Sequence, residues 1–243
     1  MAACYAVTSS VLDAPYSGTV APQLVADLVR WDEERLQRAR KAFDVEVREP
    51  GPVPTWSDVS GLGAAGEFAR LALYADLVVL RQDDPANPAG VPADFNETVI
   101  LASGKPALVI PYTGWTRAIG QTAVIAWKET PQAARAVAAA LPLLRRARRV
   151  HVLQWGRQSE PAVKGHGLDL KGYLGLHEIE PVWHDGGDEP SAVGELALSR
   201  AFDLDADLLV MGCYGHSRAR ELVLGGMSRT LLKSMTLPVL MAH

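Results

Sequence analysis

Glycines near the C-terminus have the spacing of a phosphate-binding loop. The tetrapeptide Gly212–Gly215 directly follows an apolar run, Asp207–Met211, and nine residues later comes Gly225–Ser228, where a helix is expected to begin. Glycine permits positive φ angles and close approach of the backbone to a ligand. The first amides of a helix and its positive dipole end attract phosphate. The pattern therefore indicates a polyphosphate site.

Basic side chains surround this glycine loop. His216, Arg218, Arg220 and Arg229 would add positive charge close to it. The alternative interpretation is a tight turn that only packs a helix against a sheet. Three placed glycines and a hydroxyl at a helix start favour the binding site over that turn.

The elements that would position the loop occur twice in the chain. Ala75–Leu80 and Lys105–Ile110 resemble Ala206–Met211 and Leu237–Met241, with landmark residues 131 and 132 positions apart. Two landmark pairs with nearly equal separation indicate a duplication. The short apolar runs are typical of strands buried on both faces, as in parallel sheets covered by helices.

Alternating strand and helix signals predict an α/β fold of two tandem Rossmann-like or flavodoxin-like open parallel sheets, with helices on both faces. The predicted strands of the second half are Thr122–Trp127, Val150–Trp155, Ile179–His184, Asp207–Gly212 and Pro238–Met241. Its predicted helices are Pro131–Leu144, Leu168–His177, Pro190–Phe202 and Ser228–Ser234. For the first half we expect strands at Ala3–Ser10, Val45–Glu49, Asp76–Leu80 and Pro106–Pro111, a long helix at Pro22–Phe43 and an amphipathic stretch at Gly66–Tyr74.

The first half is one strand short. The opening strand and helix of the second half occupy about 28 residues before Val150, whereas the matching strand of the first half already begins at Ala3. We infer a first domain, residues 1–114, that lacks its opening βα unit, and a complete second domain, residues 115–243. Because the first strand of a doubly wound sheet is usually central, its absence should leave strands without a neighbour or force an unusual pairing.

The glycine loop and its flanks resemble the signature of the universal stress protein family. The resemblance rests on Asp207-Leu-Leu-Val-Met-Gly-x-x-Gly215, a gap of nine residues, Gly225-Gly-Met-Ser228 and the closing Leu237-Pro-Val-Leu240. The sequence of Gly212–Gly226 is especially similar to that of tandem-domain proteobacterial members. It implies domain pairing along the last strands, and ATP binding, with or without magnesium, in one subclass. Carried over, the nucleotide-binding residues are Ala126, Trp127, Lys128, Val152, Met211, Gly212, Gly215, His216, Gly225, Gly226, Met227 and Ser228.

Two positions depart from the ATP-binding pattern of that family. Lys128 stands where those proteins have an aspartate, and an ammonium can only donate hydrogen bonds. The loss of such a contact typically costs on the order of 1–3 kcal/mol, or roughly 5- to 150-fold in affinity. Alternatively, the Lys128 side chain would reach the phosphates and make a contact of its own. Gly226 replaces the usual serine or threonine, although Ser228 still supplies a hydroxyl.

Other motifs are weaker. Gly61-x-Gly63-x-x-Gly66 fits a dinucleotide pattern, but the Pro-containing segment Pro50–Ser60 separates it from the strand expected at Val45. In the first half, Asp83 and Asp84 follow the strand where phosphates would lie, and carboxylates repel phosphate. We therefore expect no nucleotide in the first half.

No catalytic set or metal site stands out. The six histidines have no metal-ligand spacing, and the basic run Arg145–Arg149 is expected to be a solvated cluster at a helix C-terminus. Trp127 and Trp155 fall near strand ends, where they would flank a base or fill the core. Cys4 and Cys213 are far apart, as expected of free thiols in a reducing cytosol.

The charge and hydropathy of the sequence argue against some classes of binding partner. The formal net charge of −4 argues against a nucleic-acid or anionic-membrane partner, and no apolar run is long enough to cross a bilayer. The sequence lacks a secretory signal at its start, so we expect a cytoplasmic protein. An adenine nucleotide, pairing of the two domains and a homo-oligomer are the partners considered.

Three functions are compatible with these patterns. The first is a stress-response protein whose C-terminal domain binds ATP in a regulatory, essentially non-catalytic role. The second is a nucleotide-independent interaction or dimerisation scaffold, which Lys128 and Gly226 favour. The third is a slow ATPase, which has the least support because no general base is identifiable. Which stress, which partner protein and which nucleotide are left open.

Overall fold

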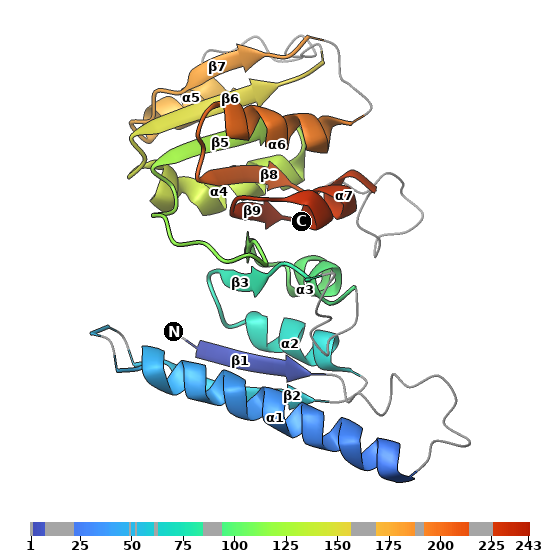
Figure 1. The fold of residues 1–243 in the computed structure, drawn as a ribbon. Coiled ribbons are helices and arrows are strands. Elements are labelled where there is room, and N and C mark those ends of the chain that lie inside the picture. Colours follow the sequence, from blue (N-terminus) through green and yellow to red (C-terminus); the bar gives the residue numbers. More distant parts are fainter. Residues whose placement is uncertain are drawn as a thin grey trace. The chain divides into compact units, whose positions relative to one another are not determined.

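The computed structural model describes residues 2–7, 22–48, 50–51, 53–60, 63–84, 94–156, 169–187, 192–213 and 226–243 (Figure 1). The chain forms two compact units. The first contains Met1–Leu71 and Asp83–Ala102, and the second contains Ala72–Gln82 and Ser103–His243. Strands and helices alternate along both, and every strand pair except one is parallel, which confirms the α/β class.

The second unit is built on a seven-stranded sheet in the order β3-β4-β9-β8-β5-β6-β7. Among the strands that the structure describes, only β4 and β9 pair antiparallel. The strands are β3 (Val78–Arg81), β4 (Ala107–Ile110), β5 (Thr122–Trp127), β6 (Arg149–Gln154), β7 (Val182–Asp185), β8 (Leu208–Gly212) and β9 (Val239–Ala242).

Helices cover both faces of this sheet. In Figure 1, α4 (Pro131–Leu144) and α5 (Leu170–Leu176) lie on one face, and α6 (Val193–Asp203) and α7 (Gly226–Ser234) on the other. The start of α4 is fixed by the Thr130 side chain, which accepts a hydrogen bond from the Ala133 amide at 3.3 Å, with proline at the first helical turn. The core under α4 is fully buried and includes Ile125, Val152 and Val210.

The first unit has its own two-stranded parallel sheet, β1 (Ala2–Val7) with β2 (Thr55–Ser60). It also contains α1 (Pro22–Glu46) and most of α2 (Ala64–Ala72) and α3 (Phe95–Ser103). Aromatic side chains hold α1 against the sheet: Trp56 stacks on Tyr5 and contacts Phe43, and the Arg40 guanidinium lies 5.0 Å from the Trp56 ring centroid.

The described elements of the second half agree with the predicted ones to within a few residues, and β5 and α4 agree at both ends. One predicted strand of the first half, Val45–Glu49, is wrong. Val45 lies in the last turn of the long helix α1, and the Val47 amide still donates to the Phe43 carbonyl, as in a helical turn. The strand lies instead at β2, in a segment that was expected to be a proline-containing connection.

The strands of the first half are divided between two sheets. β1 and β2 pair with each other, whereas β3 and β4 join the larger sheet. The compact units do not follow the predicted division between residues 114 and 115, and that boundary stays a prediction.

No helix within the described ranges combines the length and apolar character that crossing a membrane requires.

Candidate functional site

The carboxyl ends of β5 and β8 meet where the strand order of the sheet changes direction. β6 and β7 lie on one side of β5, and β9 lies beyond β8 on the other. Ala126 and Met211 are paired across the two strands. In open α/β sheets, ligands bind outside the carboxyl ends of the strands at such a switch point.

Part of the glycine loop can be placed. Gly215, His216 and Gly225 lie outside the described residues. α7 begins at Gly226, two residues before the predicted start at Ser228, and Ser228 is fully buried in its first turn. Met227 is in the helix, with its side chain outside the described part. Because the first amides of a helix have no intrahelical acceptor, α7 presents donors just after the loop.

A buried glutamine holds the other end of α7. The Gln82 side chain, 3% exposed, donates from Nε2 to the carbonyls of Leu232 and Lys233, at 2.8 and 3.1 Å. Its Oε1 accepts from the Tyr112 amide at 3.1 Å. These bonds satisfy carbonyls of the last helical turn and tie α7 to the end of β3.

Gly212 has a packing role at the end of β8. A Cβ at this position would lie 2.5 Å from the Ala133 amide nitrogen and 2.8 Å from the Gln132 carbonyl carbon. Both atoms are backbone, so neither can rotate away. Glycine is therefore needed here to bring β8 against the N-terminus of α4, whatever contact it makes with a ligand.

Asp207 organises the entrance to β5. Its carboxylate, in a residue only 3% exposed, accepts the amides of three consecutive residues. The Gly120 amide lies 2.6 Å from Oδ1, the Gln121 amide 2.9 Å from the same atom, and the Thr122 amide 3.2 Å from Oδ2. A buried carboxylate held by several backbone donors fixes where β5 starts relative to β8.

The residues carried over from β5 and β6 differ in accessibility. Lys128 is exposed, whereas Trp127 is half-buried and packs against the core. Val152 is fully buried in the core beneath α4 and α5, so it supports the sheet and lies away from the surface. Trp155 lies over Gly186, where a Cβ would overlap the indole ring, and so joins the ends of β6 and β7.

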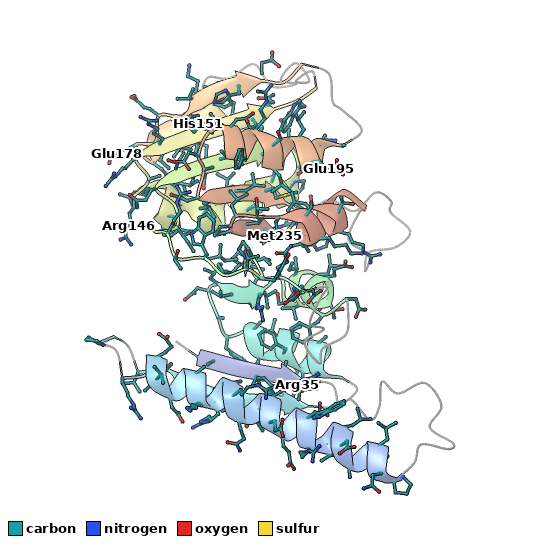
Figure 2. All side chains as sticks on the ribbon, viewed as in Figure 1. Arg35, Arg146, His151, Glu178, Glu195 and Met235 are labelled. Carbon is teal, nitrogen blue, oxygen red and sulfur yellow. The ribbon has the colours of Figure 1, made fainter. Side chains whose placement is uncertain are left out.

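A histidine pair lies on β6 and β7, away from the glycine loop in sequence. His151 Nδ1 and His184 Nε2 are 2.9 Å apart, and the strands bring the two residues together through the Leu153–His184 register. Figure 2 labels His151 on the larger sheet. Burial, with smaller effects of His184 and Arg149, lowers the pKa of His151 below its ordinary value.

The glycine pattern at Gly61–Gly66 has a different context from the one expected. β2 ends at Ser60, directly before it, and α2 begins at Ala64, so the expected separation from a strand is wrong. Gly61 lies outside the described residues. A Cβ at Gly63 or Gly66 would meet nothing within 4 Å, so neither glycine makes the close approach that the dinucleotide pattern uses.

Asp83 lies two residues after the end of β3. Burial raises the pKa of Asp83, and Glu97 raises it further. Within the described ranges, no group of three or more candidate ligands could hold a metal ion. Cys213 is buried as a free thiol, and burial raises its pKa to about 12.

Comparisons with known proteins agree with this geometry. Residues 189–243, which contain β8, α7 and β9, match the model of the universal stress protein family. This C-terminal segment therefore resembles the universal stress protein family. The family match covers the whole glycine loop. The comparison with curated proteins finds no match.

Three solved structures resemble the fold. A universal stress protein from Archaeoglobus fulgidus DSM 4304 has a TM-score of 0.67 and 13% identity, over 98% of this chain and 84% of that one. A functionally unknown protein from Pseudomonas aeruginosa PAO1 has a TM-score of 0.56 and 15% identity, over 84% and 76%. A putative universal stress protein from Pseudomonas aeruginosa UCBPP-PA14 has a TM-score of 0.55 and 16% identity, over 84% and 77%. At these identities the likeness shows the fold alone.

Sequence reasoning missed the contacts that shape the site. Neither the hydrogen bonds of Asp207 to the start of β5 nor those of Gln82 to the end of α7 are predicted from the sequence. The recurrence of the Ala-Asp-Leu triplet at Asp76 and Asp207 was the available sign that the carboxylate has a structural task.

Proposed function

We propose that this stress-response protein binds an adenine nucleotide, ATP, at the carboxyl ends of β5 and β8, in a regulatory and essentially non-catalytic role. The observation that carries the proposal is the position of α7. Its first turn begins at Gly226, directly after the glycine loop, in the segment that matches the family model. Backbone amides at a helix start are suited to the phosphates of such a ligand.

The chemistry of the described residues fits a nucleotide in two respects. The switch point between β5 and β8 is where doubly wound sheets bind their ligands. Ser228 adds a hydroxyl within the first turn of α7, although this residue is buried and already makes an interaction. ATP would be held by amides of α7 and of the loop before it, with the base beside the end of β5.

The role of Lys128 distinguishes two modes of binding. Lys128 is exposed at the end of β5, where its ammonium can reach phosphate but cannot accept a hydrogen bond from a ribose or base. If Lys128 contacts phosphate, Lys128→Asp weakens binding through lost attraction and added repulsion. If Lys128 merely replaces an accepting carboxylate, Lys128→Asp strengthens binding by roughly 5- to 150-fold.

Isothermal titration of the full chain with ATP, with and without magnesium, tests the proposal. The expected result is one ATP per chain and an altered affinity for Lys128→Asp. Lys171→Asp on α5 is the matched control, because it makes the same charge change at an exposed position and should leave affinity unchanged. Absence of binding heat in both conditions would remove the nucleotide role.

The competing candidate is a nucleotide-independent scaffold. Gly212 and Asp207 favour it, because packing against α4 and anchoring of β5 account for both residues without a ligand. Purified protein that carries a bound nucleotide, visible in its 260/280 nm absorbance ratio, would count against the scaffold.

A further inference from the structure

Two histidine side chains meet across β6 and β7, at the edge of the larger sheet. Side chains alternate between the faces of a strand, so His151 lies on the face opposite Val150 and Val152, which belong to the core under α4. Because Leu153 pairs with His184, both imidazoles lie on the α6 side of the sheet (Figure 1). His151 is 8% exposed, and His184 is half-buried.

The geometry of the two rings is that of a hydrogen bond. His151 Nδ1 and His184 Nε2 are 2.9 Å apart, whereas the ring centroids are 5.2 Å apart and the ring planes are inclined by 39°. The centroid separation matches the nitrogen separation plus a ring radius at each end, so both nitrogens lie between the rings and point at each other. An N–H of one ring therefore meets the lone pair of the other, because two N–H groups or two lone pairs would repel.

This contact has a limited capacity for protons. The neutral pair holds one hydrogen between the facing nitrogens. After the pair binds one proton, the contact remains, since the charged ring donates and the neutral ring accepts. A second proton would take up the remaining lone pair, and two charged N–H groups would then face each other. The second proton therefore breaks the contact that the first one leaves in place.

The charges around the pair do not favour the second proton. Burial, followed by His184 and Arg149, lowers the pKa of His151 below its ordinary value. These influences include no carboxylate. On β7, Asp185 points to the opposite face, and its carboxylate accepts from the Gly187 amide at 2.9 Å.

The neighbouring elements have no buried charge beside the pair among the described residues. The residues of β5 include no titratable side chain. The charged residues of α6, which covers this face, are all exposed: Glu195, Arg200 and Asp203. The closed arrangement therefore holds one added proton more readily than two.

We propose that His151 and His184 form a pH-sensitive switch that holds β7 on β6 and releases it when both imidazoles are protonated. Among the described strands, β7 pairs with β6 alone, and none of its residues is buried. Elements with little burial are the ones that open locally without unfolding of the rest.

Release of β7 uncovers the next strand of the sheet. Val150, Val152 and Leu153 of β6 are buried, and their backbone would become the new edge. An apolar strand edge of this kind is a template for another strand. The switch thus makes a strand-pairing surface available in acid and covers it at neutral pH.

The proton count sets the steepness of the opening. The opened pair binds two protons and the closed pair binds one. The equilibrium constant for opening of β7 should therefore rise about tenfold for each pH unit below 6.5, the ordinary histidine pKa. Above that pH the opened pair carries no extra protons, so β7 should stay closed.

Amide hydrogen exchange of the full chain from about pH 5 to pH 8, corrected for the intrinsic exchange rate, tests the switch. Protection at residues 182–187 should fall about tenfold per pH unit below 6.5, while residues 208–212 of β8 stay protected. His151→Gln keeps a neutral hydrogen-bonding side chain opposite His184 and should make protection of β7 independent of pH. His177→Gln, at the C-cap of α5 and outside the pair, is the matched control and should keep the wild-type pH dependence.

Nitrogen NMR of the imidazole rings in the unaltered chain tests the pair without a substitution. The two rings should be protonated in two separate steps, as interacting groups are, with a neutral accepting nitrogen retained after the first step. A single common step for both rings would overturn the proposal. So would protection of β7 that does not change with pH, or a His151→Gln variant with the wild-type pH dependence. An equal loss of protection at residues 208–212 would also overturn it, because acid would then unfold the sheet as a whole.

Discussion

Replacement of Asp207 by asparagine should destabilise the larger sheet far more than the small change in side-chain size suggests. The wild-type carboxylate accepts amides from Gly120, Gln121 and Thr122 while the residue is only 3% exposed. In Asp207→Asn, one carboxylate oxygen becomes an NH₂ group. That group is itself a donor and would face backbone donors.

The magnitude follows from the bonds that are lost. A hydrogen bond to a charged group contributes about 1.5–3 kcal/mol, and a buried donor left unsatisfied costs about 1–3 kcal/mol. Since one oxygen can still accept, we expect Asp207→Asn to lower the free energy of unfolding by about 2–4 kcal/mol. Urea denaturation of the full chain measures this change, and hydrogen exchange of residues 122–127 shows whether it originates at β5.

Asp205→Asn is the matched control, two residues away. The Asp205 side chain is 85% exposed, pairs with Arg117 at 3.1 Å on the surface and has φ of 49°, which asparagine tolerates. It should change stability by no more than about 1 kcal/mol. Equal losses in the two variants would refute the assignment of Asp207 as the anchor of β5.

Three further variants or conditions test other contacts. Gly212→Ala should lower the free energy of unfolding by about 1–3 kcal/mol in urea denaturation, because the added Cβ would meet the Ala133 backbone. Gly175→Ala, in open space on α5, should leave that free energy unchanged or raise it. Burial raises the pKa of Cys213 from its ordinary value of 9.0 to about 12 in the folded chain, so the unfolded chain loses its proton first. Stability should therefore fall as pH rises above about 9, less so in Cys213→Ala, and a disulfide reagent at pH 8 should label Cys213 only after unfolding. The pKa of His151 is lowered mainly by burial, so the unfolded chain binds a proton first as pH falls below 6.5. Stability should decrease in that window, and His151→Gln should flatten the decrease measured by urea denaturation; an unchanged slope would contradict the burial argument.

Most strands of the second half could be predicted from sequence because they are buried on both faces. All five residues of β8 are buried, so the strand appears in the sequence as a continuous apolar run. The start of α4 was equally clear, because Thr130 and Pro131 are a cap and a first-turn residue that act locally. Local signals and burial pointed to the same elements there.

The first half was harder because its elements are only partly buried. In β2, which belongs to a two-stranded sheet, Val59 is the one buried residue among those whose burial is described, and the strand has no continuous apolar run. In α3, the adjacent residues Val99 and Ile100 are both fully buried, so the helix lacks the one-sided pattern that identifies most surface helices. Val45, an apolar residue after a long helix, was assigned to a strand although it continues α1.

The candidate site was predictable only in its backbone signals. Glycines and a helix start can be recognised from spacing, and α7 begins two residues before its predicted start. The contacts of Asp207 with the entrance to β5 join residues 85–87 positions apart, and those of Gln82 with α7 join residues 150–151 positions apart. Side-chain contacts over such separations leave no local pattern, and only the folded sheet brings them together.

Amide hydrogen exchange of the full chain, with and without excess ATP, tests most directly whether the C-terminal half holds a nucleotide. We expect slower exchange in the first turn of α7 from Gly226 and at the ends of β5 and β8, residues 126–128 and 211–213. Exchange at β3 and β4 should stay unchanged. Unaltered exchange at α7 and at the ends of β5 and β8, or protection confined to β3 and β4, would contradict nucleotide binding at this switch point.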